Sequence, residues 1–311
     1  MKKPIYVEEL SPDTPCKLRH FRKIRLFEAF RDKCVLDVGC GTGYFTSHLA
    51  ATAGRLHAID IAEANAELTR HNVPAATVTV GDVHDLPCPD AFAECVFCSE
   101  VLEHLADPVQ GVRQLDRVLK PGGLLLLTFP IRPRLPTSRF LLRVSDRLTA
   151  YYYGSDHPQA HQGLLRIEDV SRRLAGMGYS MLRQDRIKNT LVLHVTEIFS
   201  ISVKLAQLLI RGGRAGGVEL ADHAAHVNAA VSAVWRWLGL PACRALAIVD
   251  ALFNGFDSSC AVILARKPDP SEPSAPRPGA ERVSVPGQRD PDADGLPAQA
   301  ASAFSGASQK S

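Results

Sequence analysis

The 311-residue sequence lacks three features that would assign it to a class directly. Its formal net charge is only +3, so no bulk electrostatic attraction to nucleic acid is expected. It has no uninterrupted apolar run of about 20 residues, the length that a membrane-spanning helix needs. The residues that follow Met1 carry no apolar core of an export signal. We therefore expect a cytoplasmic protein that does not bind nucleic acid.

Cysteine is present, but not in the paired arrangement that holds a metal. The eight cysteines are scattered, and only Cys95 and Cys98 have C-x-x-C spacing. These two fall within a predicted strand, where thiols three residues apart point to opposite faces. With no second pair at metal-binding spacing, we expect reduced cysteines and no metal cofactor.

The most informative stretch that is present covers residues 35–46, Val-Leu-Asp-Val-Gly-Cys-Gly-Thr-Gly-Tyr-Phe-Thr. Its apolar start predicts a strand buried on both faces of a parallel sheet. Gly39, Gly41 and Gly43 then form a G-x-G-x-G turn, and a helical pattern starts at Tyr44. This layout is typical of a nucleotide-type site at the carboxyl edge of an α/β sheet.

The spacing of the glycines separates two kinds of cofactor. A dinucleotide fingerprint, G-x-G-x-x-G, would need glycine where Tyr44 stands. Asp37 would repel a pyrophosphate but attract a sulfonium or ammonium. At these residues the chain resembles motif I of the class I S-adenosylmethionine (AdoMet)-dependent methyltransferases. Tight AdoMet binding would support this interpretation, and tighter NAD binding would favour a nicotinamide dehydrogenase instead.

Four later segments extend the resemblance in the expected order as far as about residue 130. Asp60 lies at the end of the second predicted strand, residues 56–61, and Asp82 follows the third. Ser99 and Glu100 follow the fourth strand, residues 92–98. Lys120-Pro121-Gly122-Gly123 leads into a fifth, residues 124–129. The resemblance implies that AdoMet is held by Asp37, Gly39, Cys40, Gly41, Gly43, Asp60, Ile61, Asp82, Val83, Ser99 and Glu100.

The order of strands and helices predicts an α/β fold: a doubly wound, seven-stranded, mostly parallel, Rossmann-like sheet with a helical insertion before its last strand. We place the methyltransferase domain at residues 34–267. Within it, residues 131–163 form a lid and residues 190–255 form the insertion. The resemblance implies that the last strand, residues 258–267, is antiparallel. The proline-rich residues 268–311 should form a disordered tail.

Three segments leave alternatives open. Residues 1–33 predict an amphipathic helix that either packs with a solvated basic face or helps to close the cofactor site. Arg139, Arg143 and Arg147 share one helix face in the lid, which either meets an anionic substrate or membrane surface or is simply solvated. The apolar helices of residues 190–255 either lie at a membrane interface or form a cap or a homodimer contact.

Methyl transfer needs the donor and the nucleophile held in line, so motif I does not name the acceptor. We expect a small-molecule or lipid-linked acceptor and O-methylation. A hydroxyl acceptor requires a base, and His104 is the first candidate, ahead of His157 and His161 in the lid. The alternative function is a non-catalytic AdoMet-binding partner of another enzyme. Such a protein would bind AdoMet without turnover of any acceptor.

Overall fold

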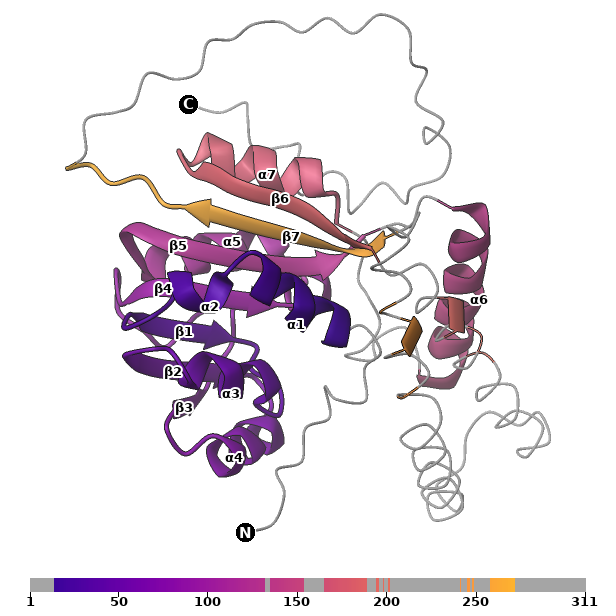
Figure 1. The fold of residues 1–311 in the computed structure, drawn as a ribbon, viewed down its shortest axis with the longest axis horizontal. Coiled ribbons are helices and arrows are strands. Elements are labelled where there is room, and N and C mark those ends of the chain that lie inside the picture. Colours follow the sequence, from indigo (N-terminus) through magenta and orange to yellow (C-terminus); the bar gives the residue numbers. More distant parts are fainter. Residues whose placement is uncertain are drawn as a thin grey trace, which may run out of the picture.

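A computed structural model describes residues 14–131, 135–153, 165–188 and 258–271, with isolated positions between 194 and 248. Seven strands form one sheet in the order β3-β2-β1-β4-β5-β7-β6 (Figure 1). They are β1 (Cys34–Val38), β2 (Arg55–Asp60), β3 (Thr77–Val80), β4 (Ala93–Ser99), β5 (Leu119–Pro130), β6 (Ser180–Lys188) and β7 (Ser258–Arg266). The β7 strand is antiparallel to both neighbours, and the pairs from β3 to β5 are parallel. The predicted doubly wound sheet is confirmed.

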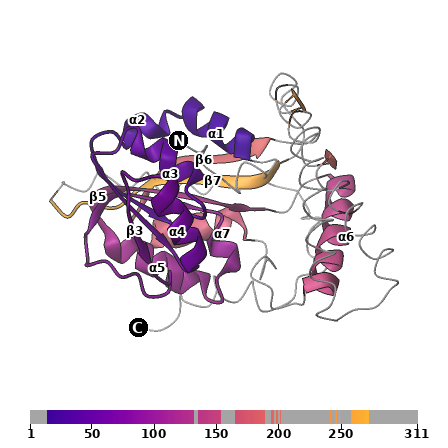
Figure 2. The ribbon, with the colours of Figure 1, turned by 90° about the horizontal axis from the view of Figure 1, so that it is seen from below.

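Helices cover both faces of this sheet (Figure 2). One face packs against α1 (Thr14–Lys23), α2 (Leu26–Ala29) and α3 (Tyr44–Ala50), and the other against α5 (Pro108–Val118) and α7 (Ile167–Gly176). The α4 helix (Glu63–Asn72) lies beside β2 and β3. A 3-10 helix, η2 (Leu102–His104), follows β4. Because each strand alternates its side chains, β4 places Cys95 in one core and Cys98 in the other, as predicted.

The fifth strand begins earlier than its apolar run predicts. It pairs Ala93 with Leu119 and then resumes at Cys95 with Leu124. The residues between form a bulge in which Gly122 has φ +72°. Proline lacks an N–H and this glycine has a left-handed backbone, so the segment loops out of the ladder without ending the strand.

The N-terminal segment also departs from prediction, because its described part forms two helices rather than one. Arg25 has φ +56°, which ends α1 and redirects the chain into α2. Most basic residues here are at least partly exposed, but Lys17 is only 5% exposed. Lys17 is therefore not part of a solvated basic face.

The predicted lid begins as a helix, α6 (Pro136–Tyr153), which carries Arg139, Arg143 and Arg147. Both views place α6 beyond the carboxyl ends of the parallel strands (Figures 1 and 2). Most of the predicted insertion over residues 190–255, the lid residues 154–163 with His157 and His161, and the tail after residue 271 lie outside the described residues. Within the described part of the chain, no helix is long and apolar enough to cross a membrane.

Candidate functional site

The glycine turn joins β1 to α3 at the carboxyl edge of the sheet. Gly39, Gly41 and Gly43 have φ values of +74°, +57° and +90°, a region that side chains with a Cβ rarely adopt. A Cβ on Gly39 would also overlap the side chain of Val101. Gly39 N and Cys40 N both donate to the carbonyl of Ile59, at 2.7 and 3.0 Å. The turn therefore presents bare backbone, as the cradle for a small ligand requires.

Asp60 ends β2 beside this turn and is bound to it directly. Gly41 N donates to Asp60 Oδ2 at 2.8 Å, while Ala62 N and Asn65 Nδ2 donate to Oδ1 at 2.9 and 3.1 Å. A carboxylate has about four acceptor positions, so one is left for a ligand hydroxyl. Accepting both hydroxyls of a ribose would require Asn65 to move away.

Asp37 lies on β1 and is only 2% exposed. The hydroxyl of Thr46, one turn into α3, donates to Asp37 Oδ2 at 2.7 Å. This bond ties the strand before the glycine turn to the helix after it. In the structure, the buried Asp37 therefore stabilises the glycine turn through its bond to Thr46.

Three residues that the resemblance assigns to AdoMet, Ile61, Asp82 and Val83, lie just past the ends of β2 and β3. Ile61 is 68% exposed, which leaves an apolar side chain uncovered next to Asp60. The Asp82 carboxylate accepts from the backbone N of His84 at 2.8 Å and lies 2.9 Å from the ring Nδ1 of His84. These bonds lower the pKa of Asp82. Val83 is instead buried in the core beside α5.

A polar cluster forms where β4 and β5 end. The hydroxyls of Ser99 and Thr128 are 2.7 Å apart, and Thr128 donates to Glu100 Oε1 at 3.0 Å. Glu100 Oε2 lies 3.1 Å from the ammonium of Lys17, a residue of α1. Cys260 of β7 completes the cluster, with its sulfur 3.5 Å from Glu100 Oε1.

Glu103 and His104 lie one turn further along, in η2. The side chain of Glu103 is 1% exposed, and its Oε1 is 3.7 Å from His104 Nε2. Neither Glu103 oxygen has a hydrogen-bond partner among the described residues. Burial, with the nearby charge of Glu100, raises the pKa of Glu103 well above its usual range. His104 is one-third exposed, so part of its ring remains open to a ligand.

The cysteine of the glycine turn is not placed to react. Burial, together with the charge of Asp37, raises the pKa of the Cys40 thiol, and its sulfur lies 3.7 Å from the Thr69 hydroxyl. A thiol held neutral is a poor nucleophile. Cys40 therefore contributes its backbone to the turn.

Sequence reasoning missed Lys17, Thr46 and Thr128. The signal for Lys17 was its spacing of four residues from Phe21, which places both on one face of α1. Thr46 follows the glycines within the first helical turn, where it can reach back to the strand. Thr128 interrupts an apolar run with a hydroxyl near the carboxyl end of β5.

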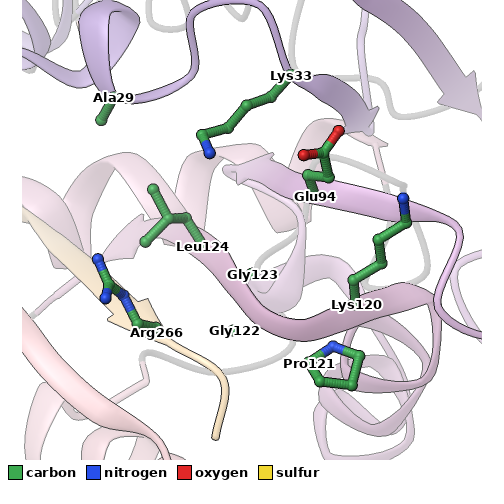
Figure 3. A pocket seen from close by; sticks show the side chains of 9 residues that line it. All are labelled: Ala29, Lys33, Glu94, Lys120, Pro121, Gly122, Gly123, Leu124 and Arg266. Atoms are coloured by element: carbon green, nitrogen blue, oxygen red, sulfur yellow. The ribbon is translucent and has the colours of Figure 1, made fainter. Parts of the chain in front are cut away.

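A cavity of about 390 Å³ lies at the opposite edge of the sheet (Figure 3). Lys33, Lys120 and Arg266 line it together with Glu94, whose Oε2 accepts from Cys34 N at 3.0 Å. Its walls come from the amino ends of β4 and β5. Ligands of open α/β sheets bind at the carboxyl ends of the strands, so this cavity is separate from the glycine-turn site.

Comparison with known proteins supports the interpretation of the turn. Residues 36–127 match the sequence model of a family described as a methyltransferase domain. A proposed S-adenosylmethionine-dependent methyltransferase of Mycolicibacterium smegmatis is 37% identical over 108 residues, which cover 35% of this chain and 42% of that protein. A ubiquinone biosynthesis O-methyltransferase of Xanthomonas oryzae pv. oryzae is 31% identical over 156 residues, covering 45% of this chain and 65% of that protein.

Solved structures agree on the fold. A proposed methyltransferase from Bacillus halodurans superposes with a TM-score of 0.51 at 18% identity, over 80% of this chain and 99% of that one. The first of the curated relatives above is matched over only about two fifths of its own length. The glycine turn, the sheet order and the sequence matches agree, and together they support a methyltransferase domain of the class I S-adenosylmethionine-dependent type at residues 36–127.

Proposed function

We propose that the protein transfers the methyl group of AdoMet to a hydroxyl of a small-molecule or lipid-linked acceptor. The observation that carries this proposal is the cradle at Gly39–Gly43, with the buried Asp60 carboxylate bonded to Gly41 N at 2.8 Å and still able to accept one more bond. A relative that is named an O-methyltransferase gives the oxygen acceptor its support.

The residues present fit AdoMet. The turn offers backbone without side chains, Asp60 retains an acceptor position for a ribose hydroxyl, and Ile61 exposes an apolar face on which adenine can lie. Asp82, half exposed, can accept from the adenine amino group. The Glu100 carboxylate supplies negative charge where the cofactor's cationic end would lie. When bound, AdoMet supplies an activated methyl group.

The chain's own part in the reaction is to align the acceptor and to remove its proton. His104 is the base in this proposal because its ring lies at the carboxyl edge and remains one-third exposed. A neutral imidazole nitrogen can accept the proton of a hydroxyl as the oxygen–methyl bond forms. A base of this kind typically contributes 10²–10⁴-fold in rate.

The first test is calorimetric titration with AdoMet and with S-adenosylhomocysteine. The wild type should bind both, and Asp60→Ala should lose binding because it removes the acceptor of a ribose hydroxyl. Glu63→Gln is the control, since Glu63 is an exposed carboxylate nearby that pairs only with Arg70 among the described residues. A folded wild type that binds neither ligand would overturn the proposal.

The second test is transfer of a labelled methyl group to lipid-extractable hydroxyl compounds. His104→Ala should lower kcat by roughly 10²–10⁴-fold and leave the Kd for AdoMet unchanged. His71→Ala, at an exposed histidine of α4, should retain activity. Binding of AdoMet without transfer to any acceptor would instead favour a non-catalytic AdoMet-binding partner.

A further inference from the structure

A buried cation reaches the site from outside the segment that matches the family. Residues 36–127 match the family model, whereas Lys17 lies in α1, ahead of it. Its ammonium is 3.1 Å from Glu100 Oε2, and its side chain is only 6% exposed. Burying a lysine requires a partner charge, so its position is not explained by packing alone.

The helix holds this ammonium firmly in place. Phe21, one turn after Lys17, is fully buried and makes an edge-to-face contact with Phe97 of β4, with ring centroids 5.6 Å apart. His20 Nε2 lies 3.2 Å from the Asp185 carboxylate of β6. Packing on one side and a polar tie on the other therefore fix α1 against the sheet.

Glu100 is equally constrained. Its φ is +58°, a left-handed conformation that costs a non-glycine residue about 1–2 kcal/mol. Such strain persists where the surroundings enforce it, and it concentrates at functional sites. Thr128 and Cys260 hold Oε1 while Lys17 holds Oε2, yet 31% of the side chain stays exposed. About a third of the Glu100 side chain therefore stays exposed at the carboxyl edge of the sheet, the edge at which the glycine turn also lies.

One cation is shared here between two carboxyl groups. Burial by itself would raise the pKa of Glu100, but the Lys17 ammonium and the Thr128 hydroxyl hold it below its ordinary value. The buried Glu103 has its pKa raised instead. In the described part of the chain, the titratable groups near Glu100 also include the thiols of Cys98 and Cys260. Lys17 is thus the cationic partner of Glu100 in this cluster.

We propose that Lys17 is a positioning residue of the cofactor site, whose ammonium fixes the Glu100 carboxylate toward the cationic end of AdoMet. This inference rests on the proposed function. It makes α1 part of the site, although α1 lies outside the matched segment. A buried ion pair adds little to stability compared with an apolar pair of similar volume, so a functional reason accounts better for its presence.

The test measures the Kd for AdoMet from about pH 6 to pH 8.5. At each pH, the Kd of the variant is divided by the Kd of the wild type to give a Kd ratio. Ionisation of the ligand itself cancels in this ratio. In Lys17→Met, Glu100 loses its cation and its pKa rises. The ratio should then fall about tenfold per pH unit as pH rises toward that new pKa. Lys17→Arg, which keeps the charge, should restore a ratio near one at every pH.

Two controls separate positioning from folding. Lys23→Met removes an exposed lysine of the same helix and should leave the ratio at one. Lys17→Met combined with Glu100→Gln removes both charges and should give weak binding with no pH dependence. If Lys17→Met alone does not fold, the double variant should fold, because it leaves no carboxylate at position 100 without its cation. A double variant that also fails to fold would assign Lys17 to packing and overturn the inference.

The outcomes also separate this inference from the proposed function. A wild type that binds AdoMet, with a Lys17→Met ratio above one that stays constant across pH, would show a merely structural role and reject the positioning of Glu100. A Lys17→Met ratio of one would reject it as well. A folded wild type that does not bind AdoMet would overturn the proposed function, and this inference with it.

Discussion

Asp60→Asn should destabilise the protein even when no ligand is present. The substitution keeps the size of the side chain but turns one acceptor oxygen into an NH2 donor. In the wild type, both carboxylate oxygens of Asp60 accept from backbone N–H groups, one from Gly41 and the other from Ala62. Whichever way the amide turns, one N–H then faces another donor.

The expected loss follows from these contacts. A hydrogen bond to a charged group contributes about 1.5–3 kcal/mol, and a buried donor left without an acceptor costs about 1–3 kcal/mol. Asp60 is 7% exposed, so water replaces the lost bond poorly. We expect the free energy of unfolding to fall by about 2–3 kcal/mol. With a urea dependence of about 3 kcal/mol per M, the midpoint should fall by roughly 0.7–1 M.

Urea unfolding followed by circular dichroism, with and without AdoMet, measures the loss of stability and the loss of stabilisation by the ligand. Saturation at 100 times the Kd should stabilise the wild type by about 2.7 kcal/mol and Asp60→Asn by much less. Asn65→Ala is a matched comparison, because it removes a single donor to the same carboxylate and leaves both backbone bonds intact. An unchanged urea midpoint in Asp60→Asn would refute the claim that this carboxylate organises the glycine turn.

Three further substitutions test separate parts of the fold. Gly39→Ala should cost at least about 1–2 kcal/mol and weaken AdoMet binding, because φ is +74° and the new Cβ overlaps Val101; calorimetry and thermal unfolding check both. Glu103 has a raised pKa in the folded state, so its contribution to stability is present below about pH 4.5 and is lost as pH rises toward the raised value. Glu103→Gln should therefore flatten the fall in urea midpoint between about pH 5 and pH 8, and an unchanged slope would contradict this assignment. Tyr179→Phe removes a 2.8 Å bond to Asp116 and should lower stability by about 1 kcal/mol without changing the Kd for AdoMet.

The sheet could be predicted from sequence because its strands are buried on both faces. Mostly apolar runs at residues 35–38 and 124–129 predict such strands, and the glycine turn fixes where the first one ends. The antiparallel last strand came from the resemblance to a family. The apolar pattern could not predict the bulge at Lys120–Gly123. Residues on both sides of this bulge pair with β4, and the sequence of β5 alone does not show that pairing.

The acidic residues of the site show a similar division. Their spacing placed Asp60 and Asp82 at strand ends, which is where the structure has them. Spacing did not indicate that Asp60 bonds the glycine turn, nor that Asp82 already binds His84. It also missed the pairing of Glu100 with Lys17, since residues distant in sequence meet only when a helix packs across the sheet.

The glycine turn is held in its working shape by bonds that need no ligand. Thr46 ties Asp37 from the helix side, and Asp60 holds Gly41 N from the neighbouring strand. Thr69 of α4 donates to the Gly41 carbonyl at 2.8 Å, so the middle glycine is fixed at both its N–H and its C=O. Ordering a glycine costs more backbone entropy than ordering any other residue. A glycine turn that was flexible before the ligand arrived would incur this cost on binding. Because folding has already ordered the turn, little of the cofactor's binding free energy is spent on it. Asp37 and Asp60 have this structural role as well as any contact with the ligand.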